Sequence, residues 1–301
     1  MNIVDSNGEF TKGDFSRQIC DRAIEYVDNN KSPFCLYLDF FGPHEPWMGD
    51  VHRMPFLEKL IDEIPSSWGS MPTLDYGAKT IRQQAQVKEE DLRVIQALYA
   101  AEVAYFDQCL GSFLRRMEQM DDTLVILTSD HGTHLGEGGH IHKSPELLNA
   151  AVTRLPLIMK FPGNKYAGKR VDGLVGAMDI VPTILDVLNI KHQNHIDGTS
   201  VLSLITGKQN KIHDEICTFF GTRQRGRKTV GIRDSNHSFY QQLFEGLENY
   251  EAGLFDYRQD PRELINLLDK VHRTRESVKI ARRLRERIEE NIGSSLASDD
   301  I

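Results

Sequence analysis

Residues 129–143 form a dense cluster of chemically active side chains directly after an apolar run. The segment contains four histidines, two acidic residues, four glycines and one lysine. Asp130 and His131 are adjacent, so together they can give a metal ion one carboxylate oxygen and one imidazole nitrogen. Lys143 can neutralise an anionic group as a point charge. These residue types favour a site that binds an anion beside a metal ion.

A second polar cluster, residues 42–47, contains His44 and directly follows the apolar run 34–41. In open parallel sheets, ligands bind outside the carboxyl ends of the strands. If both apolar runs are strands of such a sheet, His44 faces the same cleft as Asp130. Taken singly, an Asp-His-Gly turn or a histidine beside prolines is usually structural. The placement of both clusters at strand ends is what favours a functional site.

The elements that must position these clusters alternate between helices and strands. Apolar residues three and four positions apart predict three helices: 14–29, 92–120 and 177–188. Asp179 is the expected N-cap of the last helix, with Pro182 in its first turn. Short apolar runs bounded by turn residues predict three buried strands: 34–41, 123–128 and 155–161. This alternation predicts an α/β fold with a mainly parallel sheet sandwiched by helices.

Residues 42–90 are weakly periodic, and we expect a long excursion there with one short helix near 54–61. The character of the sequence changes near Gly207. Four short strand-like pieces follow and predict a small antiparallel sheet: 216–220, 229–232, 238–240 and 253–257. Residues 271–292 then predict a charged helix. Its arginines are interleaved with glutamates, which is typical of a solvated face and not of a nucleic-acid patch.

Composition limits the classes of function. The 301 residues carry a formal net charge of −8, which argues against a general nucleic-acid binder. No apolar run approaches the ~20 residues that span a bilayer, and residues 1–8 lack a signal-peptide pattern. The four cysteines show no metal or disulfide spacing, and we expect Cys35 and Cys109 to be buried thiols. An acidic α/β enzyme or a binding module remains.

Six segments resemble, in the same order, the motifs of the sulfatase family of the alkaline-phosphatase-like superfamily. Two of them carry the polar clusters: Pro33–Trp47, and Thr128–Gly132 followed by Leu135–Glu137 and Lys143. The other four are Arg154–Gly163, Met178–Leu185, Asp197–Leu202 and a C-terminal hairpin signature between Leu254 and Leu267. The resemblance implies an alkaline-phosphatase-like fold. It divides the chain into a catalytic α/β part (1–207), a small antiparallel subdomain (208–270), and a charged helix with a tail (271–301).

The resemblance also assigns roles by position. It makes Asp130 and His131 metal ligands, and it gives His44 and Lys143 the role of holding the sulfate or its leaving oxygen. It implies one divalent metal ion, most often Ca²⁺ in this family, and a sulfated or other anionic ester as substrate. His131 stands where many sulfatases have asparagine, and an imidazole shifts the expectation toward Mn²⁺ or Zn²⁺. Three more histidines lack a certain counterpart, and we expect them in the loop or at the substrate rim: His134, His140 and His142.

The family's nucleophile is a formylglycine made from the first residue of a Cys/Ser-x-Pro/Ala-x-Arg motif. None of the four cysteines lies in such a motif, and no serine does. An Asp-Asp metal pair expected on a first strand is also missing. The sequence therefore resembles the C-terminal two-thirds of the family pattern, and we expect this chain alone to show no measurable sulfatase turnover.

Three readings of the function remain open. The first is a metal-dependent sulfuric ester hydrolase. The second is a phosphonate monoester or phosphodiester hydrolase of the same superfamily, which the Asp130–His131 pair favours slightly. The third is a non-catalytic fragment. An in-frame Cys-x-Pro-x-Arg upstream of this sequence in the parent DNA would separate the first two readings from the third.

Overall fold

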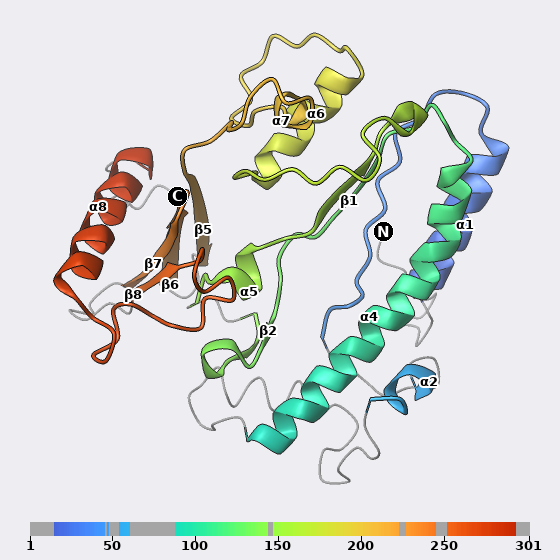
Figure 1. The fold of residues 1–301 in the computed structure, drawn as a ribbon. Coiled ribbons are helices and arrows are strands. Elements are labelled where there is room, and N and C mark those ends of the chain that lie inside the picture. The colour runs from blue at the N-terminus through green and yellow to red at the C-terminus, as the bar shows by residue number, and fades with distance from the viewer. Residues whose placement is uncertain are drawn as a thin grey trace. The chain divides into compact units, whose positions relative to one another are not determined.

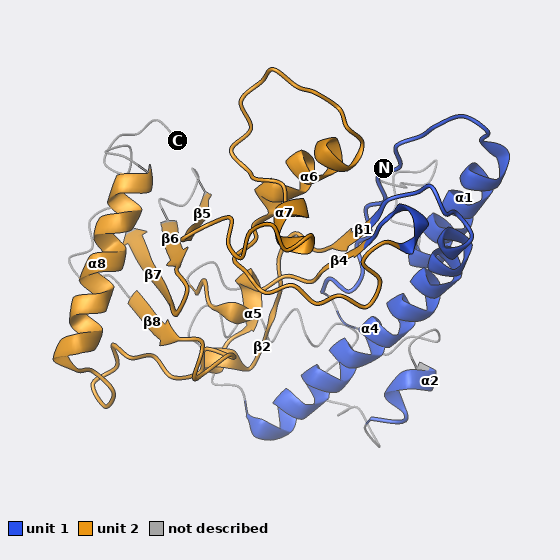
Figure 2. Cartoon of the chain, turned by 45° about the horizontal axis from the view of Figure 1, so that its top comes forward, with its two compact units in different colours: residues 1–125, 160–164 blue, residues 126–159, 165–301 orange. Residues whose placement is uncertain are grey.

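The computed structural model describes residues 15–45, 47, 54–60, 88–143, 147–222, 227–244 and 252–292 (Figure 1). The chain forms two compact units, one of residues 1–125 and 160–164 and one of residues 126–159 and 165–301 (Figure 2). The predicted boundaries at 207 and 270 both fall inside the second unit and stay predictions. No helix in the described part of the chain is long and apolar enough to cross a membrane.

The first unit is built on two helices that pack together, α1 (Phe15–Asn29) and α4 (Glu89–Glu118). Both confirm the predicted apolar spacing: α1 buries Cys20, Ala23 and Val27, one to two turns apart. Acidic residues in the first turn of α4 and arginines in its last turn complement the helix dipole. A short helix, α2 (Met54–Leu57), packs on α4 through the buried Leu57. The rest of the excursion 61–87 lies outside the described residues.

The predicted buried strand at 34–41 is wrong. The structure assigns no strand there, and exposed residues alternate with half-buried ones. The half-buried side includes Phe40, whose ring meets Phe106 of α4 edge to face at 5.2 Å. Tyr37, on the other side, is 85% exposed. A doubly buried strand needs a hydrogen-bonded neighbour and a cover on both faces. Within the described residues no strand pairs with this segment.

The two cysteines that were predicted to be buried differ in their exposure. Cys35 lies on the exposed side of the segment, so its predicted burial is wrong. Cys109, on the inner face of α4, is buried as predicted. The apolar neighbours of Cys35 in the sequence indicated a core strand, but burial depends on packing partners that local sequence does not reveal.

β1 (Val125–Thr128) pairs with β4 (Leu157–Lys160) in a two-stranded sheet, and all of its residues except Val125 and Lys160 belong to the second unit. These elements confirm the strands predicted at 123–128 and 155–161 but not their predicted burial: β1 is at most half-buried, and Leu157 and Ile158 of β4 are exposed. Between them lie an antiparallel pair, β2 (His134–Leu135) and β3 (Ile141–His142), and the short helix α5 (Ala150–Thr153). The other short elements of this unit are the 3₁₀ turns at Glu137–Gly139 and Ala177–Asp179, and the helices α6 (Ile180–Val187) and α7 (Leu202–Ile205). A third 3₁₀ turn, Pro162–Asn164, belongs to the first unit.

Asp179 occupies the N-cap position of α6, as predicted, but its side chain does not cap that helix. The fully buried carboxylate accepts hydrogen bonds from Gly176 N at 2.8 Å and from Thr199 N at 2.7 Å. His213 Nε2 lies 2.9 Å from the same carboxylate. One side chain thus ties together three segments, among them the Asp-Gly-Thr motif at 197–199.

The C-terminal part of the second unit is the antiparallel sheet that the sequence predicts. It has four strands in sequential order: β5 (Ile216–Thr222), β6 (Arg227–Arg233), β7 (His237–Phe244) and β8 (Ala252–Asp256). Helix α8 (Arg275–Ile292) covers one face, with Leu284 and Ile288 in the core beside Phe239 and Leu254. Adjacent strand residues point to opposite faces. Tyr240 and Phe255 accordingly pack on the other face, against Leu147 and Leu148.

Candidate functional site

Asp130, His131 and Lys143 meet just beyond the end of β1. His131 Nε2 lies 3.6 Å from Asp130 Oδ2 and 3.3 Å from Lys143 Nζ. The side chain of Asp130 is 85% exposed and that of His131 is 33% exposed. Three of the four predicted site residues therefore form one group that solvent can reach. Their roles as metal ligands and as anion holder stay predictions.

The turn fixes the ring of His131. Its Nδ1 lies 2.8 Å from the carbonyl oxygen of Gly132, which can only accept, so Nδ1 carries the proton. Nε2 is then the acceptor, and the Lys143 ammonium donates to it. Asp130 Oδ1 accepts the backbone N–H of His131 at 2.8 Å, which leaves Oδ2 on the open side. One imidazole nitrogen and one carboxylate oxygen thus face the same space as the lysine.

His44 belongs to the first unit, and its expected meeting with Asp130 stays a prediction. It is half-buried, and its backbone N–H donates to Phe41 O at 2.9 Å. The imidazole lies over the Phe41 ring at 4.4 Å, with Nδ1 against the backbone carbonyl of Glu45. Donation from Nδ1 to this carbonyl makes Nε2 the nitrogen that the prediction assigns to the substrate.

Gly132 explains why glycine follows the Asp-His pair. A glycine in such a turn can let the backbone approach a ligand closely. At Gly132 the close neighbour is instead α5: its N–H donates to Val152 O at 2.8 Å, and a Cβ there would lie 2.0 Å from Ala151 O. Any larger residue would push the Asp130–His131 turn off α5.

We expect Gly132→Ala to destabilise the chain by about 1–3 kcal/mol, the usual cost of forcing extra volume into a packed site. Thermal unfolding measures this. Gly111→Ala is the matched control, since Gly111 lies inside α4, where a Cβ meets nothing closer than 3.4 Å. Alanine favours a helix, so the control should be neutral or stabilising. Equal melting temperatures for the two variants would contradict the close contact.

A buried polar network lies beneath the site, and sequence reasoning missed it. His134 is fully buried and His142 is 4% exposed, so neither lies at a substrate rim. His134 Nδ1 lies 2.8 Å from His142 O, and its Nε2 lies 3.0 Å from Asn149 Oδ1. Asn149 also caps α5, accepting Ala151 N at 3.2 Å. His142 has a left-handed φ of 64°, which turns the chain directly before Lys143.

Glu263 anchors this network to the C-terminal sheet. It is 2% exposed, and its Oε2 accepts the backbone N–H of Ala150 at 2.6 Å. Its Oε1 accepts from the guanidinium of Arg233 on β6. We refer to His134, His142, Asn149, Glu263 and Arg233 as the buried network. The only sequence signal for it was that Glu263 belongs to the C-terminal hairpin signature, which assigned it no role.

Burial lowers the pKa of His134 below its ordinary value of 6.5. The unfolded chain therefore binds the proton more readily than the folded chain. We expect the free energy of unfolding to fall as the pH drops from 6.5 toward the folded-state pKa, by at most about 1.4 kcal/mol per pH unit. Chemical denaturation at pH 5 to 8 measures this.

His134→Gln should be less stable than the wild type at pH 7.5, and the difference should shrink below pH 6.5. His195→Gln is the matched control, because the side chain of His195 is 88% exposed. That variant should keep the wild-type dependence on pH. A constant difference between His134→Gln and the wild type across this range would contradict the lowered pKa.

The sequence matches the family model described as "Sulfatase" over residues 2–190, which is more than half of the chain. The chain belongs to the sulfatase family. Residues 136–292 of this sulfatase-family chain also match a model described as "N-sulphoglucosamine sulphohydrolase, C-terminal". The second match covers the four-stranded sheet, α8 and Lys143.

Sequence similarity to curated proteins supports this family assignment. The multifunctional alkaline phosphatase superfamily protein PehA of Trinickia caryophylli is 29% identical over 82% of this chain and 54% of its own length. An arylsulfatase of Clostridium perfringens is 25% identical, over 83% of this chain and 53% of its own. A choline-sulfatase of Rhizobium meliloti is 28% identical, over 84% and 50%. The sulfatase-family chain spans about half the length of these relatives.

Solved structures confirm the fold. A putative sulfatase from Bacteroides thetaiotaomicron aligns with a TM-score of 0.71 at 22% identity, over 92% of this chain and 63% of that one. A protein in complex with its substrate D-glucosamine-2-N,6-O-disulfate aligns with a TM-score of 0.67 at 20% identity, over 94% and 70%. The expected alkaline-phosphatase-like α/β fold with its C-terminal antiparallel sheet is therefore confirmed.

Proposed function

We propose that this chain carries part of the active site of a sulfuric ester hydrolase. The observation that supports this most directly is the meeting of Asp130, His131 and Lys143 beyond β1 in a sulfatase-family chain. The proposed substrate is a sulfated or other anionic ester.

The proposed chemistry follows from the charges of these groups. The Lys143 ammonium binds an oxygen of the sulfate group and stabilises the negative charge that develops on the leaving oxygen. His44 in its imidazolium form donates the Nε2 proton to the departing alkoxide, which leaves as a neutral alcohol, and His44 remains as an imidazole with its proton on Nδ1. The negative charge of Asp130 would repel a sulfate unless a cation lay between them.

Asp130 and His131 are the residues that would hold one divalent metal ion. Asp130 Oδ2 and the unprotonated Nε2 of His131 lie 3.6 Å apart, which suits two ligands of one ion. An ion bound at Nε2 would replace the hydrogen bond that Lys143 donates to this nitrogen, so the ammonium would turn to the sulfate. Among the described residues, no three or more His, Cys, Asp or Glu side chains lie together in a group that could hold a metal ion. The nitrogen ligand favours Mn²⁺ or Zn²⁺ over the family's usual Ca²⁺. When bound, the ion would draw negative charge from the sulfate oxygens.

The test is turnover of 4-nitrophenyl sulfate by the complete gene product and by residues 1–301 alone. Each protein is stripped of metal and then supplied with Ca²⁺, Mn²⁺ or Zn²⁺. We expect metal-dependent hydrolysis by the complete product and loss of it in Asp130→Ala. Residues 1–301 should show no turnover, because losing a covalent nucleophile costs on the order of 10⁴-fold. Inactivity of the complete product would overturn the proposal.

A second candidate is a phosphonate monoester or phosphodiester hydrolase. The histidine at position 131, next to Asp130, favours it. The same assay with phenyl 4-nitrophenylphosphonate separates the two. A higher kcat/KM for the phosphonate than for the sulfate would select the second candidate.

A further inference from the structure

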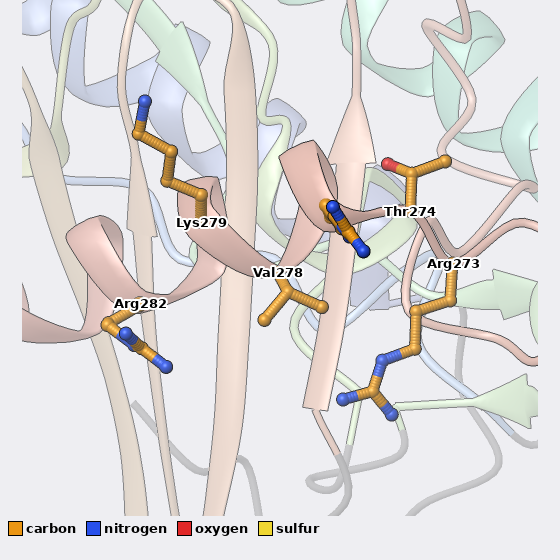
Figure 3. A pocket seen from close by; sticks show the side chains of 6 residues that line it. Arg273, Thr274, Val278, Lys279 and Arg282 are labelled. Carbon is orange, nitrogen blue, oxygen red and sulfur yellow. The ribbon is translucent and has the colours of Figure 1, made fainter.

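A shallow groove with a volume of about 410 Å³ lies along the first two turns of α8. Six residues line it, four of them cationic: Arg273, Thr274, Arg275, Val278, Lys279 and Arg282. We call this the basic groove. Arg273 and Arg282 flank Val278, which is half-buried and forms an apolar floor between them (Figure 3). All four cationic residues are exposed.

The cations of the basic groove differ from the other arginines of the same helix. Arg283, Arg285 and Arg287 form ion pairs with Asp234, Glu289 and Glu215, respectively. With the residues that the structure describes, no ion pair or hydrogen bond is formed by the side chains of Arg273, Arg275, Lys279 or Arg282. Their charge is therefore available to a ligand.

Helical geometry gathers these charges on one outer face. Arg275, Lys279 and Arg282 stand four and three residues apart, so they project from the same side of α8. Leu284 and Ile288 face the sheet on the opposite side. Seven residues of helix rise about 10 Å, so the stripe is longer than a single sulfate or phosphate ion. Glu286 and Glu289 follow on the same side and end the stripe.

The basic groove is positively charged, although the chain as a whole has a negative net charge. Residues 270–283 contain six lysines and arginines and one glutamate, in a chain with a net charge of −8. The groove is only about two helical turns long, so it binds only a short segment of a ligand. A ligand that fits must carry several anionic groups within about 10 Å and cover an apolar floor between them.

We propose that the basic groove binds a sulfated polysaccharide chain, an inference that rests on the proposed sulfatase function. Planar guanidinium groups bind sulfate esters through paired hydrogen bonds. A sugar ring can cover Val278 while its sulfates meet Arg273 and Arg282. The groove lies on the α8 side of the sheet, whereas Leu147 and Leu148, which follow Lys143 in the chain, pack on the other side. It therefore holds a polymer away from the reacting group.

The test compares two triple variants with the same change in charge. Arg273→Gln/Lys279→Gln/Arg282→Gln removes three cations of the groove, and Arg283→Gln/Arg285→Gln/Arg287→Gln removes three ion-paired ones. Heparin binding by residues 1–301 is measured by calorimetry as a function of salt, with desulfated heparin and duplex DNA as further probes. Circular dichroism checks that both variants fold.

We expect the groove variant to bind heparin at least tenfold more weakly, with a shallower dependence of affinity on salt. The ion-paired variant should bind within about twofold of the wild type. Equal weakening in both variants, no binding of heparin by the wild type, or tighter binding of DNA than of heparin would each overturn the proposal. This experiment measures binding and not turnover. The groove can therefore be shown to bind heparin even if the protein does not hydrolyse sulfate esters.

Discussion

Lys143→Ala is expected to lower the turnover of a sulfate ester by the complete gene product at least ~100-fold. The lysine ammonium lies 3.3 Å from His131 Nε2, so it is a fixed positive charge in the group that we assign to the sulfate. Loss of one preorganised donor to a developing negative charge typically has this effect on kcat. Steady-state kinetics with 4-nitrophenyl sulfate measures it.

The fold of the Lys143→Ala variant should remain nearly intact. The side chain is half-buried and lies outside the hydrophobic clusters around the C-terminal sheet, so its removal should cost little stability. Lys143→Arg should recover only part of the activity, because a planar guanidinium cannot replace a compact ammonium in a small space. Lys165→Ala, at an exposed lysine of the same unit, is the control. Wild-type turnover in Lys143→Ala would show that the lysine does not touch the sulfate.

Much of the fold could be predicted because its signals are local. The apolar spacing in α4 and α8 and the short runs in β1 and β4 each identify an element without knowledge of its neighbours. Residues 34–41 show the limit of such signals. Their apolar run reads as a doubly buried strand, yet Tyr37 is 85% exposed. Burial of a strand depends on what pairs with it, and that is set by other parts of the fold.

In the candidate site, too, some residues could be predicted from local sequence and others could not. Asp130, His131 and Lys143 were predicted because their residue types, the end of β1 and the family motif agree. His134 was misjudged as a loop or rim residue. The buried ring of His134 contacts Asn149, which lies fifteen residues further along the chain. Asn149 caps α5, and the first residue of this helix, Ala150, donates to Glu263, 113 residues away. No spacing rule connects residues at such separations, so only the three-dimensional structure reveals the support beneath the site.

Glu263→Gln is expected to cost about 3–5 kcal/mol of stability, the usual cost of breaking a buried ion pair by removing one charge. The carboxylate accepts from both Arg233 and Ala150 N, and its side chain has no solvent exposure. A glutamine amide can satisfy one of these donors but presents an N–H group to the other. Chemical denaturation of residues 1–301 measures the loss. Glu289→Gln makes the same change in the exposed pair with Arg285 and should cost no more than about 0.5 kcal/mol.

The role of Glu263 in positioning the site can be separated from its role in stability. Glu263 holds the first residue of α5, and Gly132 packs against the same helix. A loosened α5 should therefore disturb the ring of His131. We expect shifted His131 imidazole resonances in Glu263→Gln under conditions where the variant is fully folded, and unchanged resonances in Glu289→Gln. In a double-mutant cycle, Arg233→Met should recover part of the stability lost in Glu263→Gln, since it removes the unpaired guanidinium. Unshifted resonances, or strict additivity in the cycle, would mean that the buried network does not carry this coupling.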